Sequence, residues 1–474
     1  MATEDWSCNG LEALQLQLCR SKAEKDKCAA SKEDARLVTP FEPTFVYPIF
    51  GQEETIFGYR NLKIDLRFAS GSLKQYLDVS YDEKFPHTGT GEVEADDPEK
   101  ALYEFIPPSY SKDLAEFDKV VDRDARESKP LGVKLETYRD VRRRSERRDG
   151  VDKDDSGPSY ETLEAVGDDV EGGGRGDDEG DEVIYEAYWS NWDTPGFKEF
   201  HRRAQIFVLL YIEGAQYIDE EDQRWEFVTL FERRRHRGPT GRIESSTYHF
   251  MGYVSFYSFF CWPDTKRLRL AQFVLLPPYQ GQGHGSQLYN ICYKDICRRS
   301  EISELTVEDP SEAFEDLRDK CDLETLISSG DLDNCVARLD DYGNDAKTTN
   351  GTEGKGKGKG KATSLDQKVT AVIDREWTER IRKKHKLADR QFYRLVEMVL
   401  LLQLKQAAKA ESSSERRDRA FRLMVKHRLY LFNKEQLVQI DDAGERKLKL
   451  QETFESVVGD YERLLEKFLV PPVQ

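Results

Sequence analysis

The hydrophobic pattern of the chain changes character between Arg267 and Ser286. An apolar run with strand character, residues 268–276, is stopped by Pro277 and Pro278, and a Gly-rich loop follows at 280–285. Beyond the loop, apolar residues recur at three- and four-residue steps, at Leu288, Ile291, Cys292 and Ile296. The pattern therefore predicts a strand, a Gly-rich loop and a helix in direct succession.

This succession is typical of a phosphate-binding site. Glycines let the backbone approach an anion closely, and the start of a helix presents unpaired N–H groups. A dinucleotide fingerprint would need a third glycine where Ser286 stands, and a nucleoside-triphosphate loop would need a lysine after the glycines, so both fail. What remains is Gln280-x-x-Gly283-x-Gly285, with a purely structural turn as the alternative.

A second predicted strand, residues 302–307, follows the helix and ends in Glu308, Asp309 and Pro310. Strand, helix and strand form a crossover unit with parallel strands, whose carboxyl ends share one edge of the sheet. Ligands bind at that edge, so Glu308 is expected near the molecule held by the Gly-rich loop. A carboxylate in that position is suited to act as a general base.

Two regions before the loop also predict ordered structure. Residues 40–81 are β-rich, with alternating apolar positions at 62–68, and Asp97 followed by Pro98 predicts the start of a short helix. Residues 197–211 predict helix, and 224–232 and 249–260 predict two antiparallel strands. The first 35 residues are polar, with a short amphipathic patch at 11–18, and we expect them to form a helix or a disordered arm.

Other stretches are poor in apolar residues. Residues 123–181 hold a block of arginines and then an acidic, Gly-rich block, so we expect a disordered insertion, and 349–364 are a Gly/Lys-rich linker. The basic block is either a nuclear-import signal or a partner of the acidic block. From residue 365 onward the composition is helical.

Composition limits the class of protein. The chain has 474 residues, enough for two to four domains, and its eight cysteines form no C-x-x-C pair, as expected of reduced thiols in a cytosolic or nuclear protein. No apolar run is long enough to span a bilayer, and the acidic first thirty residues do not resemble a secretory signal. A net charge of −18 indicates either a generally acidic surface or an acidic face for a basic partner.

Three stretches together resemble one enzyme family. They are FGYRNLKIDLRFASGSL at 57–73, QFVLLPPYQGQGHGSQLY at 272–289 and LTVEDPSEAFEDLRDKCD at 305–322. They are similar to the catalytic subunits of fungal-like type B histone acetyltransferases, which belong to the GNAT superfamily. The Gln280 loop matches the GNAT pyrophosphate loop. The resemblance leaves out the first thirty-odd residues and the insertions at about 123–183 and 330–363.

The resemblance implies an α/β fold, with a GNAT core between an N-terminal mixed α/β domain and a C-terminal helical domain. The expected parts are a polar arm (1–35), an N-terminal α/β domain (36–122), a disordered charged insertion (123–183), the acetyl-CoA-binding catalytic core (184–330), a Gly/Lys-rich linker (331–364) and a helical domain (365–474).

The resemblance also implies partners. The co-substrate is acetyl-CoA, with no metal, and the substrate is the N-terminal tail of newly made, free histone H4, with H3 in a pre-deposition complex. The expected protein partner is a WD-repeat histone chaperone of the RbAp type. We expect no direct nucleic-acid or membrane binding and a cytoplasmic and nuclear location.

Site residues follow from the same match. Three strand residues match the strand that pairs with the pantetheine arm: Phe273, Val274 and Leu275. The loop residues match the pyrophosphate site: Gln280, Gly281, Gln282, Gly283, His284, Gly285 and Ser286. Ser311 and Lys320 match further CoA contacts. Residues matching surfaces that hold the histone tail are Glu53, Glu54, Thr55, Ile56, Phe57, Tyr257, Ser258 and Phe259. No chemical role is assigned to His284.

The match assigns catalysis to Glu308, with Asp309 and Glu213 beside it. A lysine ammonium, with a pKa near 10.4, must lose a proton before it attacks, and clustered, partly buried carboxylates would raise one another's pKa toward that task. Simpler alternatives are a solvated strand end for Glu308, an acidic loop for Glu213, helix capping for Asp309 and core packing for the aromatic residues. Another amine substrate, or a histone-binding module without activity, are the alternative functions.

Overall fold

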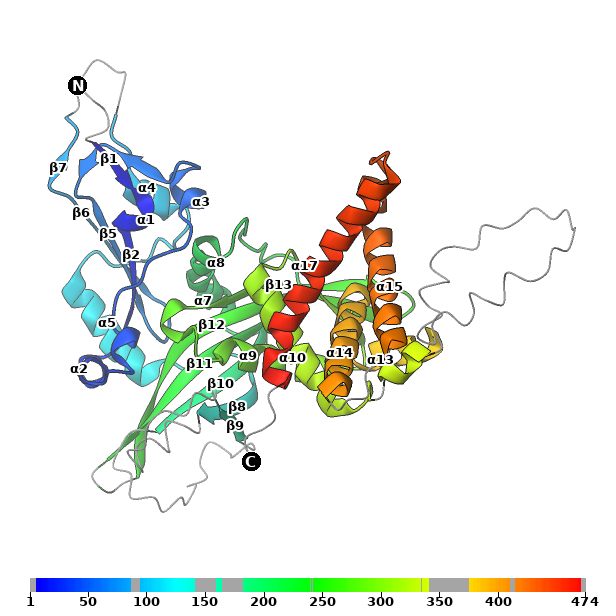
Figure 1. Ribbon diagram of the computed structural model, residues 1–474. Coiled ribbons are helices and arrows are strands. Elements are labelled where there is room, and N and C mark those ends of the chain that lie inside the picture. Colours follow the sequence, from blue (N-terminus) through cyan, green and yellow to red (C-terminus); the bar gives the residue numbers. More distant parts are fainter. Residues whose placement is uncertain are drawn as a thin grey trace, which may run out of the picture. The chain divides into compact units, whose positions relative to one another are not determined.

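The computed structural model describes residues 6–86, 94–140, 159–163, 182–238, 240, 242–333, 335–340, 375–409 and 414–469 (Figure 1). The chain divides into two compact units. The first unit comprises Met1–Phe260 and Leu268–Asp295, and the second comprises Cys261–Arg267 and Ile296–Gln474.

A small sheet forms the N-terminal part of the first unit. Strand β2 (Leu14–Cys19) pairs in parallel with β5 (Lys63–Ala69), which pairs antiparallel with β6 (Gln75–Ser80). The expectation of a helix or a disordered arm for the first 35 residues is therefore wrong at Leu14–Cys19. Helix α1 covers only Gly10–Ala13, and the next residues alternate between buried and exposed positions as a strand does.

Short elements complete this part of the chain. Strand β1 (Ser7–Asn9) pairs with β3 (Thr55–Phe57), and β4 (Tyr59–Arg60) pairs with β7 (Glu83–Lys84). The helices and 3₁₀ turn are α2 (Lys22–Ala30), η2 (Ala35–Leu37), α3 (Tyr47–Phe50), α4 (Pro98–Tyr103) and α5 (Leu114–Glu127). The predicted helix start is confirmed, because the Asp97 carboxylate accepts from the Lys100 N–H at 3.0 Å.

The large sheet has the strand order β14-β13-β12-β11-β10-β8-β9. Its strands are β8 (Val133–Asp140), β9 (Tyr160–Leu163), β10 (Glu182–Asn191), β11 (Trp225–Arg237), β12 (Ile243–Cys261), β13 (Thr265–Leu275) and β14 (Ile302–Val307). The antiparallel pairing of β11 with β12 confirms the prediction for 224–232 and 249–260. Strand β14 and the first three residues of β13 belong to the second unit.

Part of the predicted disordered insertion is folded. Residues 123–127 belong to α5, and β8, β9 and the first two residues of β10 also fall within the expected insertion. The prediction failed because this region needs few apolar residues in order to fold. Tyr138, and Tyr185 just beyond the expected insertion, bury their large rings although many neighbouring residues are polar. The arginine block and the acidic block lie outside the described residues.

Helices α7 (Phe197–Ala204) and α8 (Ile206–Tyr211) confirm the helical prediction for 197–211. The α7 side chain of Phe200 packs against Phe231 of β11 and Phe250 of β12, with ring centroids 6.0 and 5.5 Å apart. Apolar side chains of α7 thus cover the central strands. After β13, the turn η3 (Pro277–Tyr279) leads through the Gly-rich loop into α9 (His284–Arg298).

In the second unit, β14 pairs with the start of β13, where the Lys266 N–H donates to the Glu301 carbonyl at 2.7 Å. The remaining elements are helical: α10 (Glu312–Ser329), η4 (Cys335–Asp340), α13 (Arg375–Lys384), α14 (Asp389–Lys409), α15 (Glu415–Phe432), α16 (Lys434–Val438) and α17 (Ala443–Leu469). The prediction of a helical end is confirmed. The Gly/Lys-rich residues 349–364 lie outside the described residues.

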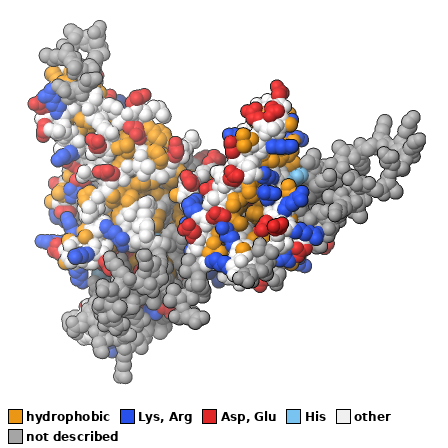
Figure 2. Space-filling model, in the orientation of Figure 1, with side chains coloured by type: hydrophobic (Ala, Val, Ile, Leu, Met, Phe, Trp, Pro, Cys, Tyr) orange, Lys and Arg blue, Asp and Glu red, His pale blue; other side chains and the backbone are white. Residues whose placement is uncertain are grey.

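The surface of the second unit mixes charges of both signs. Figure 2 shows Lys and Arg side chains interspersed with Asp and Glu over its helices on the face in view. Within the described ranges, no helix has the length and apolarity needed to cross a membrane.

A buried histidine gives the fold a pH dependence. His201 of α7 is 3% exposed among aromatic rings, and burial lowers its pKa from 6.5 to about 3. The unfolded chain therefore binds a proton that the folded chain excludes between those two values, and stability is lost as the pH falls below 6.5. We expect a loss of about 2 kcal/mol between pH 7 and pH 5 in urea unfolding. The variant His201→Phe should lack this loss, and parallel pH profiles of variant and wild type would contradict the assignment.

Candidate functional site

The Gly-rich loop has the backbone geometry expected of an anion-binding turn. Gly281 and Gly283 have positive φ angles of 71° and 84°, a region that favours glycine, and α9 begins at His284. A Cβ atom added to Gly281 would meet no described atom within 4 Å, so the space above that residue is open. The peptide groups of the loop therefore lie beside a helix N-terminus, where N–H groups remain for an anion.

The side-chain amides of two glutamines in the loop hold its backbone in place. Gln280 donates from Nε2 to the Leu275 carbonyl at 2.6 Å, and Gln282 donates from Nε2 to the Pro278 carbonyl at 3.1 Å. Both glutamine side chains thus fold back onto the chain that precedes them. These side-chain amides therefore close the turn.

The N-terminal segment, which we define as residues 6–37, supports the loop from one side. The Arg36 guanidinium donates to Oε1 of Gln282, and Nη2 of Arg20 donates to the Tyr279 hydroxyl at 2.8 Å, one residue before the loop. Arg20 belongs to the stretch that was expected to be a polar arm (1–35), and Arg36 directly follows it. These arginines contact the chain on both sides of Gln280.

Arg20 is held by a buried ion pair. Its two terminal nitrogens each donate to a carboxylate oxygen of Glu232 on β11 at 3.0 Å, and both side chains are at most 2% exposed. Arg234 also bonds Glu232, and it reaches Asp34 at 3.0 Å. Burial opposes the charged form of Glu232, yet Arg20 and Arg234 hold its pKa well below the usual value. The carboxylate therefore stays ionised in the interior.

Tyrosines of β8, β9 and β10 contact the loop through His284. Nδ1 of His284 lies 3.0 Å from the Tyr138 hydroxyl and 3.3 Å from the Tyr160 hydroxyl, and the Tyr185 ring centroid lies 4.4 Å from the imidazole. The Tyr160 hydroxyl also donates to the Gln282 carbonyl. Sequence reasoning missed these tyrosines because they lie far from the loop in the sequence, about 95 residues or more before it, in or beside the expected insertion.

The strand predicted to pair with pantetheine, Phe273 to Leu275, forms the end of β13. Val274 is buried, whereas Phe273 and Leu275 are half-buried, as expected of a strand with two unlike faces. Its neighbour β12 has Gly252 at this point, and a Cβ there would lie 2.2 Å from the Val274 carbonyl oxygen. The register between β11 and β12 shifts beside Gly252, which marks a β-bulge.

Tyr47 connects two segments that carry predicted acidic site residues, Glu213 and Glu54. The Gly214 N–H, one residue after Glu213, donates to the Tyr47 hydroxyl at 2.7 Å, and the Tyr47 N–H donates to the Glu54 carboxylate at 3.1 Å. The Val46 N–H donates to the same carboxylate at 2.7 Å. Glu54 thus binds backbone amides at the start of α3, while Glu213 and Glu53 are exposed. Sequence reasoning missed Tyr47, although the motif around it is rich in aromatic residues.

The remaining residues predicted to bind the tail divide between surface and core. Ile56 is 1% exposed and belongs to the core, whereas Thr55 is exposed and Phe57 half-buried. Tyr257 packs between Trp225 and Phe259, with ring centroids 4.8 Å from each, and its hydroxyl donates to Asp222 at 2.9 Å. Ser258 is buried, on the opposite face of β12.

In the second unit, Glu308 and Asp309 are exposed directly after β14. The sequence offered helix capping as an alternative role for Asp309, but Asp309 does not cap the next helix. Helix α10 begins at Glu312, and Ser311 caps it by accepting from the Phe314 N–H at 3.4 Å. Asp309 instead adopts a positive φ of 31°, an uncommon backbone conformation for a residue other than glycine. Lys320 is half-buried on α10.

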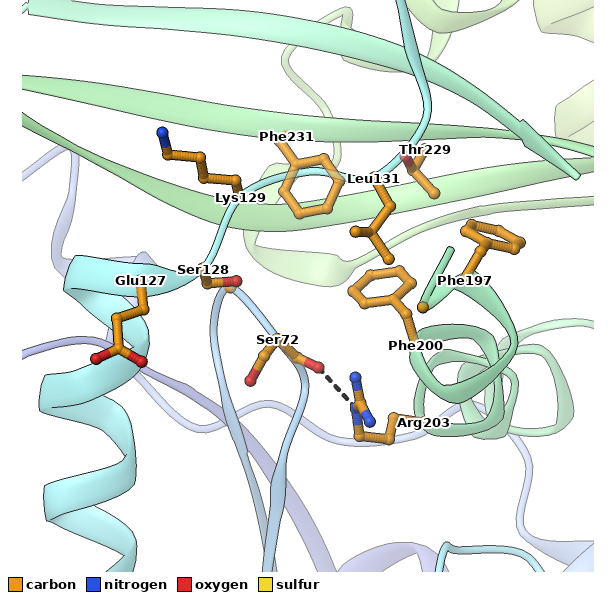
Figure 3. A pocket seen from close by; sticks show the side chains of 12 residues that line it. Ser72, Glu127, Ser128, Lys129, Leu131, Phe197, Phe200, Arg203, Thr229 and Phe231 are labelled. Carbon is orange, nitrogen blue, oxygen red and sulfur yellow. Dashed lines mark hydrogen bonds between the residues drawn. The ribbon is translucent and has the colours of Figure 1, made fainter. Parts of the chain in front are cut away.

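A cavity of about 280 Å³ lies elsewhere in the first unit, where the turn between β5 and β6 meets α5, α7 and β11. Figure 3 shows apolar side chains facing it, among them Leu131 and Phe200, and the Arg203 guanidinium, which donates to the Ser72 carbonyl at 2.8 Å. None of the predicted site residues lines this cavity.

The described residues offer no metal centre, and Cys292 is not placed as an accessible thiol. No group of three or more His, Cys, Asp or Glu side chains among them is placed to hold a metal ion. Cys292, on the helix that follows the loop, is 3% exposed, and burial raises its pKa, so it remains a thiol in the core.

Comparison with protein families gives three matches. Residues 6–213 match the N-terminal region of histone acetyl transferase HAT1, residues 189–315 match the acetyltransferase (GNAT) family and residues 360–405 match the C-terminal region of fungal HAT1. The first match begins at residue 6, so the N-terminal segment lies within the region that the family shares.

Comparison with individual proteins agrees. The chain is 45% identical over 462 residues to a histone acetyltransferase type B catalytic subunit of Cryptococcus neoformans, with 98% of both chains covered. It is 39% identical to the protein of that name in Mycosarcoma maydis, covering 97% of this chain and 88% of the relative. The corresponding Kluyveromyces lactis protein is 30% identical, with 98% and 94% covered.

The loop geometry generates a prediction. Gly283→Ala places a side chain at a φ of 84°, which costs about 1–2 kcal/mol unless the loop shifts. We expect the Michaelis constant for acetyl-CoA to rise about tenfold while the turnover number changes little, measured by steady-state acetyl transfer. Gly459→Ala is the control, because Gly459 lies inside α17 with no described atom near an added Cβ, and alanine should stabilise that helix slightly. Equal Michaelis constants for Gly283→Ala and wild type would contradict the assigned role.

Proposed function

Because this chain belongs to the catalytic subunits of type B histone acetyltransferases, within the GNAT acetyltransferases, we propose that it acetylates N-terminal-tail lysines of free, newly synthesised histone H4. The observation that best supports the site is the Gly-rich loop itself. Two positive-φ glycines and a helix start form one turn of backbone suited to the diphosphate of acetyl-CoA.

The proposed reaction is direct transfer within a ternary complex of enzyme, acetyl-CoA and histone tail. Glu308 takes one proton from the lysine ammonium, directly or through a water. The free amine then attacks the thioester carbonyl, an amide bond forms and the carbon–sulfur bond breaks. The departing thiolate receives the second proton of the attacking nitrogen, so that CoA leaves as a thiol.

Two features of the second unit support Glu308 as the base. It is exposed at the carboxyl end of β14, where a substrate amine can reach it. The adjoining Asp309 has a positive φ, and uncommon backbone conformations of this kind cluster at functional sites. Because Ser311 supplies the helix cap, neither carboxylate is needed for capping.

The surface for the histone tail is proposed from the first unit. Tyr257 and Phe259 already bind cations, since Arg224 lies 4.7 Å from the Tyr257 ring centroid and Arg269 lies 4.6 Å from that of Phe259. A tail lysine would replace these arginines on the rings. Glu53 and Glu213 are exposed acids on segments that Tyr47 connects. A tail rich in glycine and lysine would bind through cation–π contacts and carboxylates. The buried Ile56 and Ser258, and the backbone-bound Glu54, would shape this surface without contacting the tail.

Glu308→Gln tests the proposed base. The amide cannot accept the lysine proton, so we expect the turnover number to fall about 100-fold or more at neutral pH, with an unchanged dissociation constant for acetyl-CoA by calorimetry. Asp309→Asn is the matched control at the neighbouring position and should lose far less. A Glu308→Gln enzyme that turns over at the wild-type rate would remove Glu308 from this role.

The substrate is tested with radiolabelled acetyl-CoA. We expect transfer to free H4 and to H3–H4, and little transfer to nucleosomes. Stronger transfer to polyamines than to histone would favour the alternative of an acetyltransferase for another amine. Binding of H4 without transfer would favour a histone-binding module. A WD-repeat chaperone of the RbAp type and a cytoplasmic and nuclear location are proposed on the resemblance, and co-purification with tagged enzyme from each fraction tests both.

A further inference from the structure

The cluster of Tyr138, Tyr160, Tyr185 and His284, which we call the Tyr–His cluster, has no role in the mechanism above. Three of its members come from strands β8, β9 and β10, and the fourth opens the helix that follows the Gly-rich loop. The cluster lies within the first unit. His284 is 1% exposed and Tyr138 is fully buried, so these polar groups have been brought into the interior at a cost that their mutual bonds must offset.

We propose that the Tyr–His cluster is a positioning device for the Gly-rich loop, which orders the loop's carbonyl and amide groups for the diphosphate of acetyl-CoA. The inference rests on the proposed function, because it takes the loop to be the diphosphate site. Tyr160 acts most directly, since its hydroxyl bonds both the Gln282 carbonyl and, at 3.3 Å, the His284 ring.

The direction of each hydrogen bond follows from the number of protons available. The single hydroxyl proton of Tyr160 goes to the Gln282 carbonyl. Burial raises the pKa of Tyr138 well above its usual value, so its hydroxyl keeps its proton. Among the described residues, Nδ1 of His284 lies 3.0 Å from this hydroxyl and can accept the proton. A buried hydroxyl proton without an acceptor is costly. Nδ1 therefore accepts from Tyr138, and the proton of a neutral imidazole is on Nε2.

This arrangement orients the peptide between Gln282 and Gly283. Tyr160 holds the Gln282 carbonyl on the side of the cluster, and in a planar peptide the N–H of the next residue points the opposite way. The N–H of Gly283 is therefore directed away from the cluster. With the peptide in this orientation, Gly283 has a positive φ. The hydrogen bond from Tyr160 to the Gln282 carbonyl thus determines the direction of the Gly283 N–H.

The placement of β9 makes the contact specific. It is a four-residue edge strand that pairs with β8, and its register sets Tyr160 opposite Asp140. Tyr138 lies across from Tyr185 in the pairing of β8 with β10, and their rings stack with centroids 5.1 Å apart. Strand β9, at the end of the described sheet, has no fully buried residue and adds little to the core, and its Tyr160 hydroxyl instead bonds the loop, as a positioning role requires.

Tyr160→Phe tests the proposal, because it keeps the ring and removes the hydroxyl. Two acetyl donors separate the causes: acetyl-CoA, and acetylpantetheine, which lacks the diphosphate. We expect kcat/KM for acetyl-CoA to fall about five- to tenfold through a higher KM, the scale of one lost hydrogen bond, while kcat/KM for acetylpantetheine stays unchanged. Tyr217→Phe is the matched control, since its hydroxyl donates to the Phe105 carbonyl at 2.7 Å away from the loop, and both donors should be unaffected.

Substitution of the imidazole gives a second line of evidence. His284→Asn keeps an acceptor near the position of Nδ1, and His284→Phe does not. We expect His284→Asn to retain more acetyl-CoA affinity than His284→Phe in calorimetric titration, at similar melting temperatures. Equal affinities of these two variants would contradict the hydrogen-bond assignment.

The outcomes are distinguishable. A Tyr160→Phe enzyme equal to wild type with acetyl-CoA overturns the positioning role and leaves the proposed function intact. An equal fall with both donors means that Tyr160 only supports the fold, which also overturns the positioning role. A wild-type enzyme that uses acetylpantetheine as well as acetyl-CoA would show that the loop does not bind the diphosphate. The assignment of the loop and the positioning role would then both fail, while acetylation of histone H4 is tested separately by the transfer assay.

Discussion

The bidentate ion pair between Arg20 and Glu232 is the interaction on which the candidate site depends. Two charges at most 2% exposed are removed from water, and such a pair is tolerated only when its geometry is good and the remaining groups are bonded. Here Arg234 and the Tyr279 hydroxyl supply further bonds, and Arg20 Nε is the guanidinium nitrogen that has no hydrogen-bond partner among the described residues. The pair ties the N-terminal segment to β11, and Arg20 extends the tie to the residue before the Gly-rich loop. The start of the Gly-rich loop is thereby held in place.

The loop is held from two sides by parts of the chain that are remote in sequence. Arg20 and Arg36 reach it from the N-terminal segment, and Tyr138 and Tyr160 reach it from strands that precede the catalytic core. For the diphosphate site that we propose, amides fixed in direction before the anion arrives favour binding, because ordering them upon binding would reduce affinity. The supports thus supply preorganisation, while the glycines supply only the freedom to adopt the turn.

The sequence was sufficient for what local pattern determines. Strand β14 has the predicted bounds, the helix at Asp97 has its predicted cap, and β13, the loop and α9 follow one another as the periodicity indicates. It was insufficient where tertiary context decides. The alternation at 14–18 was interpreted as a helical patch because its partner strand lies some fifty residues away, and β8 and β9 have too few apolar residues to stand out beside charged blocks. No pattern in one sequence could pair Arg20 with Glu232.

The most direct measurement of the central claim is the free energy of urea unfolding of the full chain carrying Arg20→Met. Removing one partner leaves a buried carboxylate without its main counter-charge, so we predict a loss of about 3–5 kcal/mol. The exposed pair of Arg60 and Glu83, with side chains 42% and 58% exposed, supplies the reference, and Arg60→Met should cost less than about 1 kcal/mol. If Arg20→Met were as stable as Arg60→Met, the buried ion pair would not be the constraint that supports the loop.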